Sequence, residues 1–385
     1  MDNYILSLFF TRGVSLKTWV DIGLFEREKQ IYETHLESGN FKKIYWLTYG
    51  SDDYKIAKNL KKQGKLHSNI FVYSMPKFFN IPKLGSYLYS LLMPLVNYKP
   101  LRNSSFLKTN QIDGSWSAVL AKWLYQKPLV VRSGYLLSQL ENKLERCSSI
   151  KLKIFELVEK IAYESCDVAV VTSKHNKKYL IGKYNLKPSK INIITNYIDT
   201  NKFFANFNVQ KEPNKIIFVG RLSPEKNIYN LINAIIETNL VLDIYGQGPL
   251  KEELKSYAIN KKAKVNFMGV VPNSKLPKIL NSYQYYILPS FYEGMPKTLL
   301  EAMACGLVCI GTDVAGINEV IEDKLNGYLS KSTKSNDIYN TIVKSMGLES
   351  KEIIKNGIKT IENNYSLKYV KNLESKIFGK LSNDQ

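Results

Sequence analysis

The sequence predicts an α/β protein made of two doubly wound domains, each built on a parallel sheet. Short runs of β-branched and aromatic residues alternate with longer amphipathic stretches, which is the pattern of repeated strand–helix units. The chain has 385 residues, enough for two or three domains. A polar stretch without periodicity, residues 196–214, separates two series of such units.

The expected strands are short and apolar. In the first series they are NYILSLFF, KKIYWLTYG, SNIFVYS, SFLKTN, PLVVRS, DVAVVTS and INIITN, with helices expected over 16–38, 114–125 and 152–165. In the second series they are KIIFVG, LVLDIYG, KVNFMG, QYYILPS and LVCIGT. We therefore place an N-terminal domain at 1–195 and a C-terminal domain at 196–365. Residues 366–385 are expected to form a helix that packs back on the first domain.

The composition is that of a globular protein with a sizeable core. Hydrophobic residues make up 44% and charged residues 23%, which excludes disordered, collagen-like and disulfide-scaffold classes. No apolar stretch is long enough to span a bilayer, and no signal peptide is recognised, so we expect a cytoplasmic protein. The four cysteines form no CxxC pair; Cys305 and Cys309 are expected to be buried, with a helix ending at Gly306 between them.

Basic residues are concentrated in the first half of the chain. The net charge is +20, of which residues 1–200 carry +14. Residues 55–102 hold nine Lys and Arg and no acid, and the aromatic residues among them are Phe71, Tyr73, Phe78, Phe79, Tyr87, Tyr89 and Tyr98. This segment could dock on the anionic inner face of the cytoplasmic membrane. Alternatively, the aromatic residues belong to the core and the lysines to an ordinary solvated face.

Two cations follow the first strand of the second series, in KIIFVGRLSPEKN. Arg221 and Lys226 would lie at the carboxyl end of a buried strand, beside a helix expected to start near Glu225. In open α/β sheets this position binds ligands, and helix N-termini favour anions. The alternative is that Arg221 and Lys226 cap the helix and pair with Glu225. We prefer a phosphate-binding interpretation.

Two carboxylates occur in SFYEGMPKTLLEAMACG. Pro296 suits the first turn of a helix, so Glu293 would lie in the loop before it and Glu301 inside it. Their spacing corresponds to roughly 12 Å along a helix axis, too far for a glycosidase acid–base pair. We expect them to accept hydrogen bonds from hydroxyls on two parts of one long ligand, although Glu301 could be an ordinary helix carboxylate.

The residues from Lys215 to Leu329 resemble the C-terminal half of the retaining glycosyltransferases of family 4, group 1 type. The matching pieces are GRLSPEKN, IYGQGPL, VNFMGVV, SFYEGMPKTLLEAMACG and GTDVAGINEVI, in that order. TRGVSLKTWVDIGLFEREKQIY and NYIDTNKF match more loosely. The resemblance implies the GT-B architecture, two Rossmann-like domains facing each other across a cleft. It also implies transfer of a sugar from a nucleotide-sugar to a hydroxyl with retained anomeric configuration.

The resemblance also implies roles for individual residues. Arg221 and Lys226 would bind the donor diphosphate and, with Glu293, carry the catalysis. The remaining residues implied at the donor are Gly13, Gly294, Met295, Thr298, Leu299 and Glu301, with Glu301 on the ribose hydroxyls. Gly13 would let the first loop of the N-terminal domain approach the diphosphate. No metal and no cofactor is expected, since the chain has no Asp-x-Asp motif.

One departure concerns the N-terminal domain, where many family members place a histidine facing the donor sugar. The corresponding stretch here is TNQIDGSWSAV, and Asp113 or Arg132 are the substitutes we consider; Arg132 could instead brace a loop through an ion pair. His35 and His175 are expected to be surface residues rather than catalytic ones. Residues 51–53, SDD, are expected to be a solvated helix start.

The sequence thus predicts a hexosyltransferase using a UDP- or GDP-linked sugar. Its acceptor would be lipid-linked or a polysaccharide, at the inner face of the cytoplasmic membrane, in surface polysaccharide or glycolipid synthesis. The alternative within enzymes is a GT-B sugar-phosphate synthase or phosphorylase with a small soluble acceptor. A basic nucleic-acid-binding protein is disfavoured, because no recognisable nucleic-acid motif is present.

Overall fold

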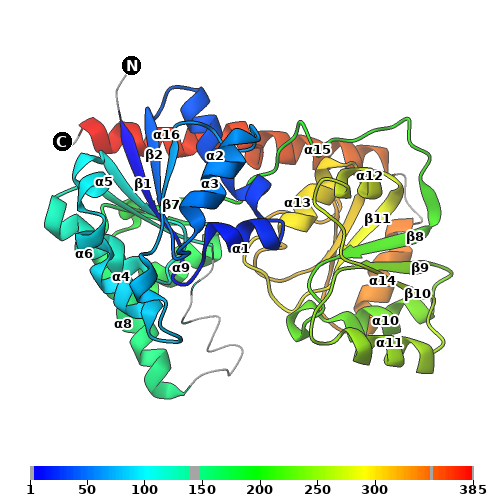
Figure 1. Cartoon of the computed structure of the whole chain (residues 1–385). Helices are drawn as coiled ribbons and strands as arrows, with labels where there is room; N and C mark the ends of the chain where they lie inside the picture. The colour runs from blue at the N-terminus through cyan, green and yellow to red at the C-terminus, as the bar shows by residue number, and fades with distance from the viewer. Residues whose placement is uncertain (1–3, 135, 137, 139–147, 347–349, 384–385) are drawn as a thin grey trace. The chain divides into compact units, whose positions relative to one another are not determined.

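The computed structural model describes residues 4–134, 136, 138, 148–346 and 350–383. They divide into two compact units, Met1–Ile194 with Lys371–Gln385, and Thr195–Val370. Each unit is built on one parallel sheet with helices packed around it (Figure 1). This confirms the predicted class of two α/β domains.

The first unit contains a seven-stranded sheet in the order β3-β2-β1-β4-β5-β6-β7. Its strands are β1 (Ile5–Phe9), β2 (Lys43–Leu47), β3 (Ile70–Tyr73), β4 (Phe106–Thr109), β5 (Leu129–Ser133), β6 (Val168–Val171) and β7 (Ile191–Ile193). Its helices are α1 (Leu16–Asp21), α2 (Phe25–Glu37), α3 (Asp53–Lys62), α4 (Gly85–Val96), α5 (Tyr98–Asn103), α6 (Ser115–Tyr125), α8 (Ser149–Ser165) and α9 (Lys174–Tyr184). The last helix, α16 (Leu367–Asn383), belongs to this unit from Lys371 onward.

The second unit contains a six-stranded sheet in the order β10-β9-β8-β11-β12-β13. Its strands are β8 (Glu212–Val219), β9 (Val241–Tyr245), β10 (Val265–Gly269), β11 (Tyr283–Leu288), β12 (Val308–Thr312) and β13 (Tyr328–Ser330). Its helices are α10 (Ile228–Ile236), α11 (Lys251–Asn260), α12 (Leu276–Asn281), α13 (Lys297–Ala304), α14 (Ser335–Met346) and α15 (Lys351–Asn364). The three-residue strand β13 was not expected, since so short a run has no period of its own.

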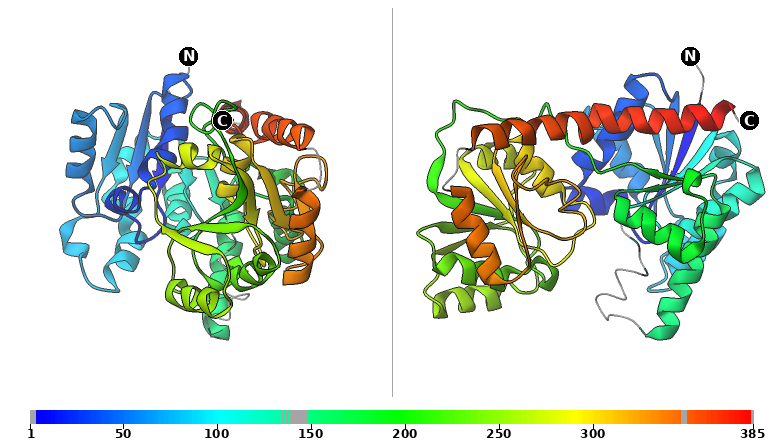
Figure 2. Two further views of the ribbon diagram at one scale, coloured as in Figure 1. Left: turned by 90° about the vertical axis from the view of Figure 1, so that its right-hand side faces the viewer. Right: turned by 180° about the vertical axis from the view of Figure 1, so that it is seen from behind.

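The strands are continuous apolar runs because helices cover both faces of each sheet, as the side and rear views show (Figure 2). Leu6 and Leu8 of β1 lie on one face and Phe9 on the other, and all three are buried. In the second unit, residues 216–218 of β8 are fully buried in the same way. The core of each unit therefore lies on both sides of its sheet.

Each sheet reverses its strand order at one point. In the first unit the reversal falls between β1 and β4, and in the second between β8 and β11. The loops that leave the carboxyl ends of these neighbouring strands diverge to opposite faces, which leaves a crevice where α/β sheets bind their ligands. The sequence candidates Gly13 and Asp113 follow β1 and β4.

Two helix boundaries differ from the prediction. The stretch expected as one helix over 16–38 is split into α1 and α2, with Gly23 at φ +72° between them. The helix expected near Glu225 begins only at Ile228, because Asn227 adopts the left-handed conformation at φ +56°. Within the part of the chain that the structure describes, no helix is both long and apolar enough to cross a membrane.

Candidate functional site

Arg221 lies in a tight loop that follows β8. The loop is paired with the loop after β9, since Leu222 N donates to Gln247 O at 3.0 Å. A Cβ on Gly246 would lie 1.8 Å from Gly220 O, so this approach requires glycine. The Arg221 side chain is exposed at the carboxyl edge of the sheet.

Lys226 ends a short 3-10 turn, η3 (Pro224–Lys226), just before α10. The Asn227 side chain fixes this turn, because its Nδ2 donates to Pro289 O at 2.9 Å and to Thr333 O at 2.8 Å. Ser223 Oγ, not Lys226, contacts the Glu225 carboxylate, at 2.5 Å. Lys226 therefore points away from Glu225, contrary to the alternative in which the two residues pair.

The partner of Lys226 is Glu293, 67 residues later in the chain. Lys226 Nζ lies 2.5 Å from Glu293 Oε1, and Ser290 Oγ donates to the same oxygen at 2.6 Å. Phe291 N donates to Glu225 O at 2.9 Å, so the backbone joins the two loops as well. The two sequence candidates thus meet where β8 and β11 end side by side.

The loop that carries Glu293 to Met295 is held from two sides. Glu293 N donates to Ala315 O at 3.3 Å, and Asn196 Nδ2 donates to Met295 O at 2.9 Å. Gly316 has φ +84°, and a Cβ there would lie 2.6 Å from Glu293 O. The backbone at Glu293 and Gly294 is therefore placed by a close approach that only glycine permits.

Helix α13 begins one residue later than expected, with Pro296 as its N-cap rather than in its first turn. Thr298 Oγ1 lies 2.8 Å from the Tyr286 hydroxyl. The Leu299 side chain is fully buried, so only its backbone could lie against a ligand. The Glu301 carboxylate accepts a long hydrogen bond of 3.4 Å from Asn273 Nδ2, and the residue is buried.

The remaining candidates belong to the first unit. Gly13 lies in the turn between β1 and α1 at φ +74°, and it is exposed. Its neighbour Arg12 forms a two-pronged ion pair with Asp113, with both N–O distances 3.1 Å. Arg12 also stacks 4.0 Å from the centre of the Tyr87 ring. Asp113 therefore holds the β1–α1 loop, and burial raises its pKa while Arg12 opposes the rise.

Arg132 lies in β5, next to β4. The Arg132 guanidinium donates to Asn110 O at 3.4 Å, and the Arg132 backbone N–H donates to Thr109 Oγ1 at 3.0 Å. Gln111 Oε1 accepts a hydrogen bond of 2.7 Å from Gly134 N. These contacts place Arg132 at the same edge of the sheet as Asp113, and a role for either in sugar binding stays a prediction.

Two expectations about surface residues need correction. Residues 51–53 do begin a helix, α3, and Asp52 is exposed, but Asp53 is buried because its carboxylate accepts Leu16 N at 2.7 Å and Lys17 N at 3.2 Å at the start of α1. His35 is fully buried, and its Nε2 lies 3.1 Å from Glu374 Oε2. Sequence reasoning missed both because each polar partner is distant in the chain. His175 is exposed, as predicted.

The expected burial of Cys305 and Cys309 is confirmed, and Gly306 follows the end of α13 at φ +73°. Burial raises the pKa of the Cys305 thiol to about 12. These thiols are therefore packing residues rather than nucleophiles. Cys147 lies outside the described residues.

Four site residues escaped the sequence analysis: Arg12, Asn196, Ser290 and Gly316. Arg12 adjoins Gly13, and Ser290 precedes Glu293 in the same motif. Asn196 and Gly316 lie in the matching pieces NYIDTNKF and GTDVAGINEVI, but their contacts with residues 293–295 cross between distant loops and so were not foreseen.

The first unit also exposes apolar side chains on three helices that pack in sequence, α4 on α6 and α6 on α8. We name this the apolar helix surface; its members are Tyr87, Leu91, Leu92 and Leu95 of α4, Trp123 and Leu124 of α6, and Ile150, Ile154, Leu157 and Ile161 of α8. Of the seven aromatic residues considered from the sequence, Phe79 and Tyr89 are buried, while Phe71, Phe78, Tyr87 and Tyr98 are exposed. The segment is thus partly core and partly surface.

Comparison with known proteins matches residues 199–360 to the family of glycosyl transferases group 1. The chain is 29% identical over 214 residues to a UDP-Gal:alpha-D-GlcNAc-diphosphoundecaprenol alpha-1,3-galactosyltransferase of Escherichia coli. That match covers 51% of this chain and 55% of the relative, so the chain spans about half the length of the first curated relatives it matches. An uncharacterised glycosyltransferase of Methanocaldococcus jannaschii, MJ1069, is 26% identical over 384 residues, covering 91% of this chain and 95% of that protein.

Solved structures share the whole fold. A sucrose-phosphate synthase from Thermosynechococcus elongatus superposes with a TM-score of 0.78 at 17% identity, covering 100% of both chains. HepE of Anabaena, in complex with UDP and glucose, superposes with a TM-score of 0.74 at 16% identity, covering 98% of this chain and 100% of HepE. At these identities the likeness concerns the fold alone.

Proposed function

Because the chain belongs to the group 1 glycosyltransferases and has the GT-B fold, we propose that it transfers a hexose from a UDP- or GDP-linked donor. The acceptor is a hydroxyl of a lipid-linked or polysaccharide molecule, and the anomeric configuration is retained, as in family 4. UDP is the favoured nucleotide, since the Escherichia coli relative uses UDP-Gal. The observation that carries the proposal is the contact of Lys226 with Glu293 at the point where β8 and β11 end side by side.

The donor would be bound along the carboxyl edge of the second sheet. Arg221 and Lys226 would bind the diphosphate, because a guanidinium forks onto phosphate oxygens and an ammonium supplies a point charge. Glu301, inside α13, would accept hydrogen bonds from the ribose hydroxyls. Glu293, with the backbone of Gly294 and Met295, would contact the sugar, and Thr298 with the backbone of Leu299 would lie against the nucleotide.

The main task of the protein in this reaction is to neutralise the negative charge that develops on the leaving diphosphate. The C1–O bond of the donor breaks with its electron pair going to the diphosphate, where Arg221 and Lys226 stabilise the developing charge. The acceptor oxygen forms its bond to C1 on the same face, and its proton passes to the departing diphosphate. Gly13 lies in the loop that Arg12 and Asp113 fix at the carboxyl end of β1. We propose that neither a metal nor a cofactor takes part.

A membrane-bound acceptor is supported by the apolar helix surface. Its exposed leucine and isoleucine side chains occur with basic residues Lys83, Lys99, Arg102, Lys151 and Lys153, and residues 55–102 contain no acid. Exposed apolar side chains among cations suit an anionic lipid interface. Two relatives, from Escherichia coli and Campylobacter jejuni, are named for diphosphoundecaprenol-linked acceptors. We therefore propose peripheral contact with an anionic membrane, in surface polysaccharide or glycolipid synthesis.

The alternative is a synthase with a small soluble acceptor. A relative from Mycolicibacterium smegmatis, 26% identical over 233 residues, is named alpha-maltose-1-phosphate synthase. Such an enzyme has no need of the apolar helix surface. Nucleic acid is not proposed as a partner.

The donor proposal is tested by thermal shift with UDP, GDP, ADP and CMP. A ligand at 100 times its dissociation constant adds about 2.7 kcal/mol to stability. One nucleoside diphosphate should stabilise the wild type, while Arg221→Ala and Glu301→Gln should lose that shift. Arg102→Ala, an exposed arginine on α5, is the matched control and should keep it. No shift from any nucleotide, or an unchanged shift in both variants, would refute the donor site.

The acceptor proposal is tested with vesicles. The wild type should co-sediment with vesicles containing phosphatidylglycerol and not with neutral ones. Leu91→Ser with Leu95→Ser should abolish co-sedimentation, whereas Val343→Ser, an equally exposed apolar residue on α14, should not. Wild-type protein that stays in the supernatant and glycosylates a soluble sugar phosphate would favour the synthase alternative.

A further inference from the structure

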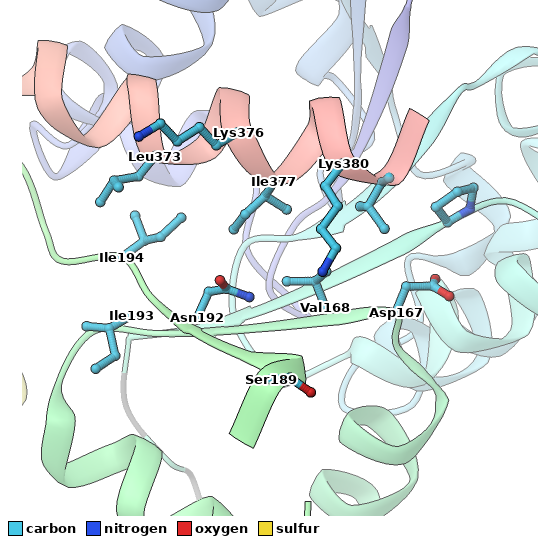
Figure 3. Close-up of a pocket in the computed structure, with 12 residues that line it drawn as sticks. Asp167, Val168, Ser189, Asn192, Ile193, Ile194, Leu373, Lys376, Ile377 and Lys380 are labelled. Atoms are coloured by element: carbon cyan, nitrogen blue, oxygen red, sulfur yellow. The ribbon is translucent and has the colours of Figure 1, made fainter. Parts of the chain in front are cut away.

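A groove of about 550 Å³ lies in the first unit between α16 and the edge of the sheet at β6 and β7 (Figure 3). Its size is within the range of small-molecule sites. The residues that line it are Pro128, Asp167, Val168, Ser189, Asn192, Ile193, Ile194, Leu373, Lys376, Ile377, Lys380 and Leu381. None of them belongs to the candidate donor site or to the apolar helix surface.

The groove exists because α16 is anchored by its other face. Glu374 and Phe378 point into the first unit, where the Phe378 ring lies 5.0 Å from the Phe41 ring and 5.3 Å from the Phe106 ring. Residues 373, 376–377 and 380–381 are one stripe further round the helix, at the spacing of a single face. Within that stripe Ile377 and Leu381 are buried, whereas Lys376 and Lys380 are exposed.

The two walls of the groove are apolar. Val168 of β6 and Ile194, directly after β7, form most of the sheet side, with the Asn192 amide beside them, and Leu373 and Ile377 form the helix side. From Leu373 to Leu381 the helix advances about 12 Å, so the groove is elongated rather than round. An extended hydrocarbon chain is the shape that such walls would bury.

The charge of the groove is positive. Lys376 and Lys380 are four residues apart, so their Cβ atoms lie about 6 Å from each other, and Figure 3 shows Lys376 running along α16 while Lys380 extends toward the strands. Among the described residues no carboxylate pairs with either lysine. Asp167, the acid that lines the groove, already accepts Lys122 Nζ at 2.5 Å and Leu129 N at 2.7 Å. Figure 3 shows Lys380 extending from α16 toward Val168 and Asp167.

We propose that this groove binds a single-chain lipid phosphate, with its apolar chain between α16 and strands β6 and β7 and its phosphate held by Lys380 and, after rotation of its exposed side chain, by Lys376. A phosphate monoester carries a charge of about −1.5 to −2 near neutral pH, which two ammonium groups from one helix would balance. This site goes beyond the proposed transfer reaction and is independent of the donor and of the apolar helix surface.

The test is isothermal titration of the full chain with decyl phosphate below its micelle concentration, without nucleotide. We expect one molecule bound per chain, and about fourfold tighter binding for each added methylene. Lys376→Gln with Lys380→Gln should weaken binding about tenfold. Lys368→Gln, an exposed lysine on the same helix outside the groove, should bind as the wild type does.

Further measurements distinguish the groove from binding elsewhere on the chain. Leu91→Ser with Leu95→Ser should bind decyl phosphate normally, because no residue of α4 lines the groove. Inorganic phosphate and decyl maltoside should each bind much more weakly than decyl phosphate. Hydrogen exchange should slow in residues 373–381 and 191–194 when decyl phosphate is bound. Absence of binding, equal binding by the double lysine variant, or binding of inorganic phosphate as tight as that of decyl phosphate would overturn the proposal.

Discussion

Lys108 Nζ donates to Glu374 Oε1 at 2.6 Å in the interior of the first unit, across 266 residues of sequence. His35 Nε2 lies 3.1 Å from the other oxygen, and all three side chains are buried. Burial alone would raise the pKa of Glu374, but Lys108 and His35 more than offset this and hold it well below its usual range. Burial lowers the pKa of His35. Burial also lowers the pKa of Lys108 in this cluster, and the Glu374 carboxylate opposes that fall.

Glu374→Gln should destabilise the first unit by about 3 to 5 kcal/mol, because it leaves Lys108 as a buried cation without its counter-charge. The tryptophans Trp19, Trp46, Trp116 and Trp123 all lie in this unit, so their fluorescence during urea unfolding reports on it. Lys55→Gln, which removes an exposed pair with Asp52 in the same unit, should change stability by less than about 0.5 kcal/mol. The double variant Lys108→Met with Glu374→Met should lose less than Glu374→Gln alone; a larger loss would contradict this role of the unpaired charge.

The same cluster predicts loss of stability in acid. His35 has a lower pKa folded than unfolded, so between the two values the unfolded state binds the extra proton and stability falls as pH drops below about 6.5. Glu374 adds a second decline below about pH 4, because its folded pKa is also depressed. Melting temperatures from pH 8 to 5 should fall in the wild type and in His175→Gln, and should fall less in His35→Gln. If the melting temperatures of the three proteins fell in parallel with pH, His35 would have no part in the loss of stability in acid.

Substitutions of Lys226 and Glu293 should affect kcat and UDP binding differently, although the two side chains contact each other. Lys226→Met should lower kcat about 10²-fold and weaken UDP binding, because it removes charge stabilisation from the diphosphate. Glu293→Gln should lower kcat while leaving UDP binding unchanged or tighter, since a carboxylate beside Lys226 opposes an anion. Donor-saturated rates and UDP dissociation constants check both variants. Weakened UDP binding in Glu293→Gln would contradict these roles.

Gly114→Ala tests the loop that holds Arg12 and Asp113. Gly114 has φ +86°, and a Cβ there would lie 3.1 Å from Arg12 N, so we expect a loss of about 2 kcal/mol or more. Gly64→Ala is the matched control, with φ +67° and no atom within 4 Å of its Cβ, and should lose about 1 kcal/mol. Urea unfolding followed by tryptophan fluorescence measures both. Equal losses would mean that the contact with Arg12 carries no energy.

The sequence was most informative where local pattern and burial agree. The continuous apolar strands and the two loops after β8 and β11 could be predicted, because each is encoded within a few neighbouring residues. The start of α10 was misplaced, because the left-handed backbone of Asn227 follows from its contacts with Pro289 and Thr333. The capping of α1 by Asp53 was missed for a similar reason, since its partners are 36 and 37 residues away.

Gly316 sets a limit on how the sugar specificity of this protein can be altered by engineering. A library that varies residues 293–295 leaves the segment around Gly316 unchanged. A Cβ at position 316 would lie 2.6 Å from the carbonyl oxygen of Glu293 and 2.7 Å from that of Gly294, which is a collision. Any larger residue at 316 would displace that loop whatever sequence it carries. Randomising both segments together would therefore yield mostly inactive clones, whereas holding position 316 as glycine keeps every variant on a common backbone.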